Sequence, residues 1–272
     1  MSNSFSAADL RTVLRFPFQA KGWLNHFLVG SALFFANAFV PFIPVIFAYG
    51  YLARVLRNTA TGQPLTMPEW NDWGGLFKDG LRSMAVGLLY LGPSTIVMVG
   101  GGFIYFAAMM TVAFTAESGA TDTATSPFFI LWLGAFFIFF ISMFLGWLQW
   151  TLCSVPLPLA LAHSAARQQF LAAFDLRAFG KIIRADKWGY LLSWVIVMGL
   201  FGVIYTAFML MYFTVVLCVF SYILLTPMVF YVMLVAAAVF GNFYRENMPV
   251  LSLLSASETT AAVIEDSSLR SE

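Results

Sequence analysis

Acidic, basic and tryptophan side chains gather between residues 54 and 82, where their types suit ion pairing or binding of a polar head group. The candidate residues are Arg54, Arg57, Glu69, Trp70, Asp72, Trp73 and Asp79, with Lys78 and Arg82 nearby. Two interpretations remain open. One is a tryptophan-anchored cap held by ion pairs, in which Gly74, Gly75 and Gly80 permit close approach. The other is a lid or binding platform over a cytoplasmic opening.

Residue types that usually carry catalysis are sparse in the rest of the chain. His26 and His163 have no Cys or carboxylate at metal-ligand spacing, so we interpret them as interfacial residues. An enzyme would require His163 to meet one of the three carboxylates named above. Cys153 and Cys218 lie in apolar surroundings and are expected to be small packing residues. The sequence therefore predicts no catalytic residue, metal site or cofactor.

Four long stretches without a formal charge indicate an integral membrane protein. They are 22–53, 83–116, 123–166 and 188–244. Hydrophobic residues make up 61% of the chain and charged residues 10%, against roughly a quarter charged in soluble domains. Because ~20 apolar residues span a bilayer and backbone groups in lipid must pair internally, we expect an all-α membrane bundle.

The positions of Lys and Arg predict the orientation of this bundle. Cytoplasmic loops carry the Lys/Arg excess, so 1–21, 54–82, 167–187 and the C-terminal tail should face the cytoplasm. The connection around 117–122 carries only acidic charge and should face outward. This pattern predicts a multi-pass protein of the cytoplasmic (inner) membrane of a prokaryote, with both termini in the cytoplasm.

Counting hairpins gives about six transmembrane helices, and seven spans or a re-entrant variant remain open. The first stretch begins and ends beside basic residues but is short for two complete helices. It forms either two short spans or a re-entrant hairpin that turns at Pro41 and Pro44. Pro156 and Pro158 predict a break near the cytoplasmic end of the third stretch.

Three short amphipathic segments precede the predicted hairpins. They begin at Asp9, Asp72 and Asp175, and each places apolar and then basic residues after the Asp. Such segments form interfacial helices with basic faces toward lipid head groups. Asp9 and Asp175 should cap helix N-termini. The similarity fits a threefold repeat of helix plus hairpin, or three independent amphipathic lead-ins.

The third segment has the clearest helical pattern. Its basic side contains Arg177, Lys181 and Arg184, and its apolar side contains Leu176, Phe179, Ile182 and Ile183. The predicted organisation is a cytoplasmic N-terminus with an amphipathic helix at 1–21, a transmembrane bundle at 22–246 and a disordered acidic tail at 247–272.

Several motifs resemble those of a known family. GYLARVLRNTATG at 50–62 is followed by PEWNDWGGLFKDGLR at 68–82, Phe16-Pro17-Phe18 precedes the first stretch, and Gly241 to Arg245 closes the last. On these motifs the chain resembles the domain-of-unknown-function 4013 family of prokaryotic multi-pass membrane proteins. The resemblance implies the multi-span fold. It implies no catalytic residue, because the family has no established activity.

We therefore expect a non-enzymatic membrane protein, an accessory or scaffold that acts on lipids or a membrane partner through its cytoplasmic face. Its partners would be membrane lipids, a membrane protein or a second copy of the chain, and not nucleic acid. No ionisable residue lies well inside a predicted span, which argues against ion-coupled transport and membrane hydrolases. The alternative is a permease or channel for a neutral or amphipathic solute, which needs a polar cavity reaching mid-membrane.

Overall fold

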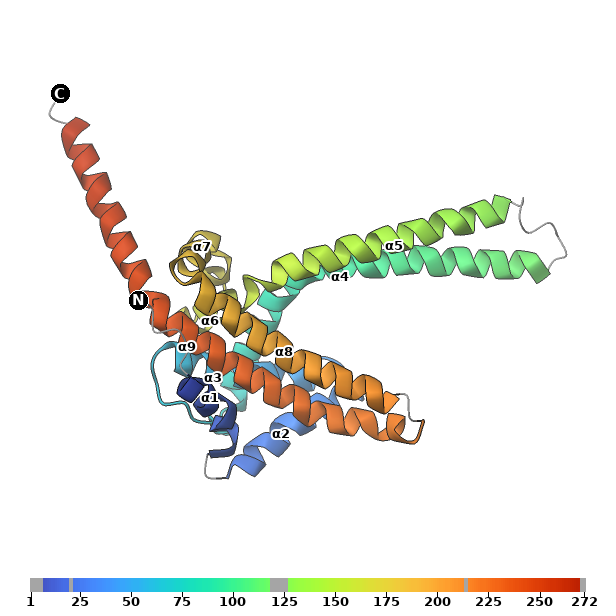
Figure 1. Ribbon diagram of the computed structural model, residues 1–272, viewed down its shortest axis with the longest axis horizontal. Coiled ribbons are helices and arrows are strands. Elements are labelled where there is room, and N and C mark those ends of the chain that lie inside the picture. The colour runs from blue at the N-terminus through green and yellow to red at the C-terminus, as the bar shows by residue number, and fades with distance from the viewer. Residues whose placement is uncertain (1–6, 20–21, 118–126, 213–214, 270–272) are drawn as a thin grey trace. The chain divides into compact units, whose positions relative to one another are not determined.

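The computed structural model describes the backbone of residues 7–19, 22–117, 127–212 and 215–269. This part of the chain is mainly helical and contains no strands, as the sequence predicts (Figure 1). The elements are α1 (Ala7–Gln19), α2 (Trp23–Ala36), α3 (Ile43–Ala60), α4 (Trp73–Glu117), α5 (Pro127–Ser154), α6 (Leu157–Arg167), the short 3₁₀ helix η1 (Leu171–Phe174), α7 (Leu176–Ala185), α8 (Lys187–Tyr212) and α9 (Val215–Leu269).

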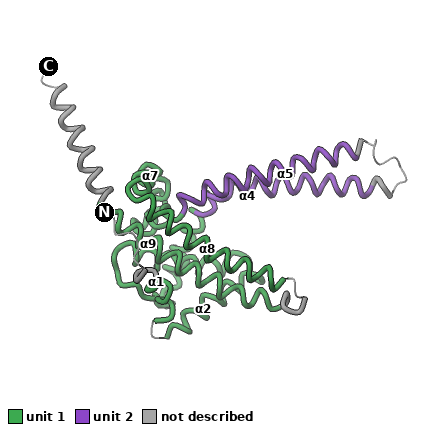
Figure 2. The backbone as a smooth tube through the Cα atoms, viewed as in Figure 1, with its two compact units in different colours: residues 1–86, 158–272 green, residues 87–157 purple. Residues whose placement is uncertain are grey.

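The chain divides into two compact units, coloured separately in Figure 2. The first comprises residues 1–86 and 158–272, and the second comprises residues 87–157. The acidic connection expected to face outward lies almost entirely outside the described residues.

The first unit is built around α9. This helix lies beside α8 in Figure 1 and also contacts α1, α2, α3 and α7. Phe230, Leu234 and Ala238 have no exposed surface and recur every four residues, so they form one buried face. Tyr51 and Val55 of α3 are buried equally deeply. In a membrane such a face is held by close van der Waals contact rather than by exclusion of water.

The amphipathic pattern of α1 agrees with the sequence analysis, but its predicted cap does not. Val13 and Phe16 are buried, whereas Arg11 and Arg15 are exposed. The helix begins at Ala7, so Asp9 lies within its first turn rather than at the N-cap position. The side chain of Asp9 lies outside the described residues.

The predicted cap of α7 is confirmed. Asp175 accepts a hydrogen bond from the backbone N–H of Ala178 at 3.1 Å. Phe179 and Ile182 are buried as expected, but Leu176 is 61% exposed although we placed it on the apolar face. Leu176 is the first residue of α7, at the end of the buried face.

The middle amphipathic segment is not a separate interfacial helix. Residues 73–82 form the first turns of α4, which continues without interruption to Glu117. No residue between Asp72 and Pro93 forces a break, and the five glycines in this stretch are accommodated in helical geometry. The threefold repeat therefore stays a hypothesis.

The second unit is a hairpin formed by the remainder of α4 and by α5. Gly101 lies against Ser142, and a Cβ atom at Gly101 would overlap that side chain. The ring of Tyr105 lies 5.2 Å from that of Phe139 between centroids. The triple glycine run therefore permits close helix contact at its central residue. Gly100 and Gly102 face open space.

Four helical segments are long and apolar enough to cross a membrane. They are Trp73–Phe114, Phe129–Ser154, Lys187–Tyr212 and Phe220–Pro249. The expectation of six full spans is not confirmed. The first uncharged stretch forms α2 of 14 residues and α3 of 18, and α3 carries Arg54 and Arg57 near its end. Hydropathy alone did not separate these shorter helices from full spans.

The two predicted proline sites coincide with helix ends. α2 ends at Ala36 and α3 begins at Ile43, so the chain reverses around Pro41. α5 ends at Ser154 and α6 begins at Leu157, which confirms the break at Pro156.

The predicted tail overlaps the end of α9, which is assigned to Leu269. Asn247, the first residue of the predicted tail, is buried and donates a hydrogen bond to the carbonyl of Phe243 at 3.0 Å. Side chains from residue 250 onward lie outside the described residues, so the disordered tail stays a prediction.

Candidate functional site

A close contact between α3 and α4 positions the charged residues of the tryptophan-anchored cap, which is the segment from Arg54 to Arg82. A Cβ atom at Gly50 would overlap the carbonyl oxygen of Leu76, and one at Gly80 would overlap the carbonyl oxygen of Ile46. Two glycines from different helices therefore allow the backbones to touch. This contact brings the arginines of α3 alongside the aspartate of α4.

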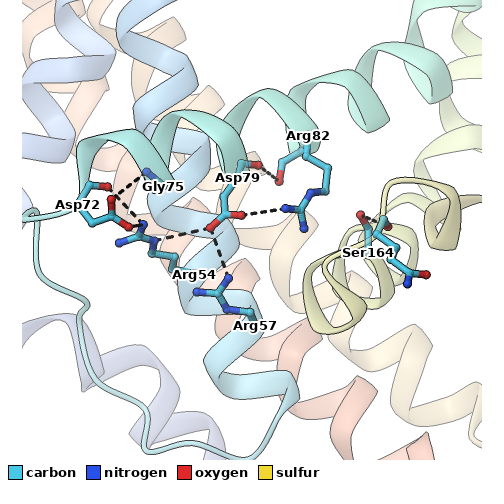
Figure 3. Close-up of polar contacts among 9 residues, drawn as sticks. Arg54, Arg57, Asp72, Gly75, Asp79, Arg82 and Ser164 are labelled. Carbon is cyan, nitrogen blue, oxygen red and sulfur yellow. Dashed lines mark hydrogen bonds and ion pairs between the residues drawn. The ribbon is translucent and has the colours of Figure 1, made fainter.

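Three arginines surround the carboxylate of Asp79 (Figure 3). Arg57 Nη1 lies 3.4 Å from Asp79 Oδ2, and Arg54 Nε lies 3.7 Å from the same oxygen. Arg82 Nη2, from one turn further along α4, lies 3.2 Å from Oδ1. The side chain of Asp79 is only 14% exposed. Burial of this kind strengthens charge pairing and makes loss of a partner costly.

Asp72 both caps α4 and pairs with Arg54. Its Oδ1 accepts the backbone N–H of Gly75 at 2.9 Å, and its Oδ2 lies 2.6 Å from Arg54 Nη2. The Gly75 hydrogen bond, followed by the hydrogen bond from Arg54, lowers the pKa of this carboxyl below its ordinary value. Because the side chain is 61% exposed, solvent screens the pair and limits its contribution to stability.

Trp70 anchors the connection between α3 and α4 to two helices. Its ring is stacked on that of Tyr51, with centroids 4.1 Å apart and planes 9° apart. Its indole N–H donates to the carbonyl of His26 at 3.2 Å. The ring centroid of Trp73 lies 5.8 Å from that of Trp70, and the Trp73 ring meets the ring of Phe47 edge-on. Trp73 nevertheless remains 44% exposed. The connection is therefore fixed to both α2 and α3.

The structure brings together six of the seven candidate residues, and Glu69 is the exception. Glu69 is exposed and accepts a hydrogen bond from Asn71 at 2.9 Å rather than pairing with an arginine. Arg82, which the sequence placed only near the cap, belongs to its centre. The available signal was its position three residues after Asp79, where a helical pair can meet. Tyr51 carried no comparable signal.

Beside Asp79 lies a small, partly open recess formed by three helices. Its lining residues are Ala53, Arg57, Asp79, Arg82, Ser83, Ser164 and Ala165. α3 and α4 supply its charged wall, and α6 supplies Ser164 and Ala165 on the other side. Ser164 Oγ donates to the carbonyl of Gln169 at 3.0 Å, which ties α6 to the following turn (Figure 3).

His163 is buried among the helices of the first unit, and its position at the membrane interface stays a prediction. It has no exposed surface, and its Nδ1 lies 2.6 Å from the hydroxyl oxygen of Tyr244. Burial lowers the pKa of this imidazole, and the nearby charge of Arg167 lowers it further. The hydrogen-bond partner of His163 among the described residues is thus Tyr244, whereas Asp72 and Asp79 pair with arginines. The meeting of His163 with a carboxylate that an enzyme would require is not among these contacts. His26 lies beside Trp70 through its carbonyl oxygen.

The described residues contain no group of three or more side chains suited to hold a metal ion. Cys153 is a free, half-buried thiol. The side chain of Cys218 lies outside the described residues.

Comparison with known proteins assigns the chain to a family. No curated protein and no solved structure matches it. One family model, described as a protein of unknown function (DUF4013), matches residues 33–213. This range is more than half of the chain and contains both the cap and the recess. The chain is therefore a member of the DUF4013 family.

Proposed function

We propose that this chain is a non-enzymatic multi-pass protein of the cytoplasmic membrane, an accessory or scaffold that acts on lipids or a membrane partner. The observation that carries the proposal is the cap itself. Its arginines are concentrated where uncharged helices end and are held in place by Asp79 and Asp72. A fixed cationic surface at a membrane boundary suits recognition of anionic head groups.

The interior of the first unit supports a scaffold over a permease. Phe230, Leu234 and Val235 of α9 and Ala48 of α3 have no exposed surface, and α3 packs against α9, so apolar side chains fill this part of the interior. A permease for a polar solute would need polar groups along a mid-membrane path. The charged recess instead lies at the ends of the helices.

The engagement of the titratable groups supports a non-enzymatic role. Asp72 caps a helix and pairs with Arg54, while Asp79 is shared by three arginines. His163 is paired with Tyr244. A general acid or base needs a free path to its substrate, whereas each of these three groups is engaged with a neighbouring side chain.

Within this proposal, α2 and α3 form a re-entrant hairpin rather than two full spans. α2 is 14 residues long, or about 21 Å, whereas the hydrocarbon core is ~30 Å thick. The turn between α2 and α3 exposes large apolar side chains, since Phe39 is 74% exposed and Phe42 is 62% exposed. Such a turn is more stable in hydrocarbon than in water.

The backbone of this turn also suits hydrocarbon, where every N–H must find an acceptor. The N–H groups of Ala38, Phe39 and Val40 donate to carbonyls at the end of α2, that of Ile43 donates to the carbonyl of Pro41, and Pro41 has no N–H. The N–H of Phe42 donates to the side-chain oxygen of Asn37 at 2.9 Å. These N–H groups of the turn therefore find hydrogen-bond partners within the turn and at the end of α2.

α7 adds a second basic surface that favours lipid as the target. Its apolar side chains are used against the rest of the unit, where the ring of Phe179 meets His163 edge-on. Arg177 and Arg184 are exposed. The ammonium of Lys187 lies 5.9 Å from the centre of the Trp188 ring, which is 70% exposed. Exposed tryptophan beside basic residues is typical of a membrane interface.

Photo-cross-linking with lipid tests the proposal. The protein would be reconstituted into vesicles that contain a trace of phosphatidylglycerol carrying a photoreactive group near its phosphate. We expect cross-linked peptides to be enriched in residues 54–82 and in α7. Equal labelling of peptides from all membrane-facing helices would contradict a lipid-directed role for the cap.

A further inference from the structure

We propose that the recess between α3, α4 and α6 binds a phosphate oxyanion, such as the phosphate of an anionic phospholipid. This inference rests on the proposed function and specifies the ligand of the cap. It is carried by the charge balance of the recess, by the donors left over on its arginines, and by its position along the chain.

The charges around Asp79 do not balance. Arg54, Arg57 and Arg82 contribute three positive charges, and the carboxylates that pair with them among the described residues are Asp72 and Asp79. The arginine side chains are only 13–26% exposed. A partly buried charge is costly unless it is paired. One further anion would bring the cluster to neutrality.

The two arginines that line the recess have spare donors. A guanidinium carries five N–H groups in a planar fork that matches a phosphate or carboxylate. Arg57 and Arg82 each meet Asp79 through a single nitrogen, and Asp79 is the one charged partner that the described residues supply to either. Most of their N–H groups therefore remain for a ligand.

The recess lies where lipid phosphates are expected. Ala53 ends the first uncharged stretch, Ser83 begins the second, and Ser164 and Ala165 lie just before Arg167, which ends the third. Three boundaries between apolar and charged sequence thus meet at one point. In a bilayer that depth belongs to the head-group region.

The size of the recess restricts the ligand. The space that remains open inside it is about 10 Å³, which is about enough for one water-sized group. A single oxygen of an oxyanion fits this space, whereas a sugar or a peptide does not. For a phospholipid, one phosphate oxygen would enter the recess while the rest of the head group and the acyl chains remain outside it.

Ligand-dependent thermal unfolding tests this inference with protein stripped of lipid in phosphate-free detergent. The probes are phosphatidylglycerol, phosphatidylcholine and inorganic phosphate, each titrated against the wild type, Arg57→Gln, Arg82→Gln and the control Arg245→Gln. Arg245 is exposed and lies outside the recess. In Arg57→Gln, Asp79 keeps Arg54 and Arg82, so this variant should fold.

We expect phosphatidylglycerol to raise the unfolding midpoint of the wild type and of Arg245→Gln, and to do so more than phosphatidylcholine. Arg57→Gln and Arg82→Gln should weaken the apparent affinity about tenfold or more, because each loses a charged hydrogen-bond donor. A similar response to inorganic phosphate would identify free phosphate as a ligand. A response to phosphatidylglycerol alone would identify the lipid.

Two results would overturn the inference, and they differ in what they imply for the proposed function. If both recess variants bind phosphatidylglycerol as tightly as the wild type, the recess is not the site, but the lipid-directed function stands. If neither anionic probe stabilises the wild type, the inference and the lipid-directed function both fail.

Discussion

Trp70 lies flat against Tyr51, with ring centroids 4.1 Å apart and planes 9° apart. Tyr51 has no exposed surface, and Trp70 is also bonded to the carbonyl of His26. One side chain thus holds the connection after α3 against two earlier helices. The geometry of the cap depends on this anchor.

Replacing Trp70 by alanine should destabilise the protein by about 2–4 kcal/mol, because it removes a large packed ring, a stacked pair and a hydrogen bond. Trp73→Ala is the matched control, since Trp73 is 44% exposed and lacks the stacked partner. Its cost should be about 1 kcal/mol. Thermal unfolding in detergent measures both. Equal losses in the two variants would show that the stack is not the anchor.

Gly80→Ala should force α3 and α4 apart, because the new Cβ atom would overlap the backbone carbonyl of Ile46, which cannot rotate away. We expect a loss of about 2 kcal/mol or more, within the range for overpacked sites. Gly74→Ala provides the control, since a Cβ atom there meets nothing within 4 Å. That variant should unfold at the wild-type temperature or slightly above it. A harmless Gly80→Ala would refute the close contact.

Asp72 should make stability depend on pH in the acid range. Its pKa is lowered in the folded protein by the Gly75 N–H and then by Arg54, so its contribution is present above the unfolded pKa. That contribution is lost as the pH falls through the folded pKa. Asp72→Asn retains a good N-cap residue but removes the charge.

The unfolding midpoints of wild type and Asp72→Asn, compared from pH 7 to about 3, test this linkage. The gap between them should shrink as the pH falls below about 4. Glu69→Gln is the control, because Glu69 pairs with Asn71 rather than with an arginine. A gap that stays constant with pH would show that the Asp72 charge adds nothing.

The re-entrant hairpin makes a topological prediction. In a background with Cys153 and Cys218 replaced, Phe39→Cys should resist impermeant maleimide from both sides of the membrane, because its turn lies in hydrocarbon. A cysteine at Gly119 should react from outside, since the 117–122 connection is predicted to face that way. Labelling of Phe39→Cys from outside would instead indicate two full spans. Labelling of the Gly119 cysteine from the cytoplasm alone would reverse the predicted orientation.

Features that depend on local sequence could be predicted. The chain reversal at Pro41, the break at Pro156 and the cap at Asp175 each follow from a residue and its immediate neighbours. The number of full spans could not be predicted in the same way. Hydropathy does not distinguish a 14-residue helix from half of a long one, so the sequence leaves two short spans and a re-entrant hairpin both open.

Contacts between distant residues were not accessible from the sequence. The residue types of the cap indicated ion pairs, but the choice of Arg82 over Glu69 depends on which turn of α4 faces α3. The pairing of His163 with Tyr244 joins residues 81 positions apart. Gly50 matters only because α4 crosses it at Leu76, and no local pattern marks that crossing.

The most direct test of the central claim is gentle purification from native membranes, followed by native mass spectrometry of everything retained. We expect the wild-type chain to retain anionic phospholipid or a membrane protein in a fixed ratio. The variants Arg57→Gln and Arg82→Gln should each retain less of that lipid than the wild type. Retention of one neutral small solute, with neither enriched lipid nor partner, would contradict the accessory role and favour a permease.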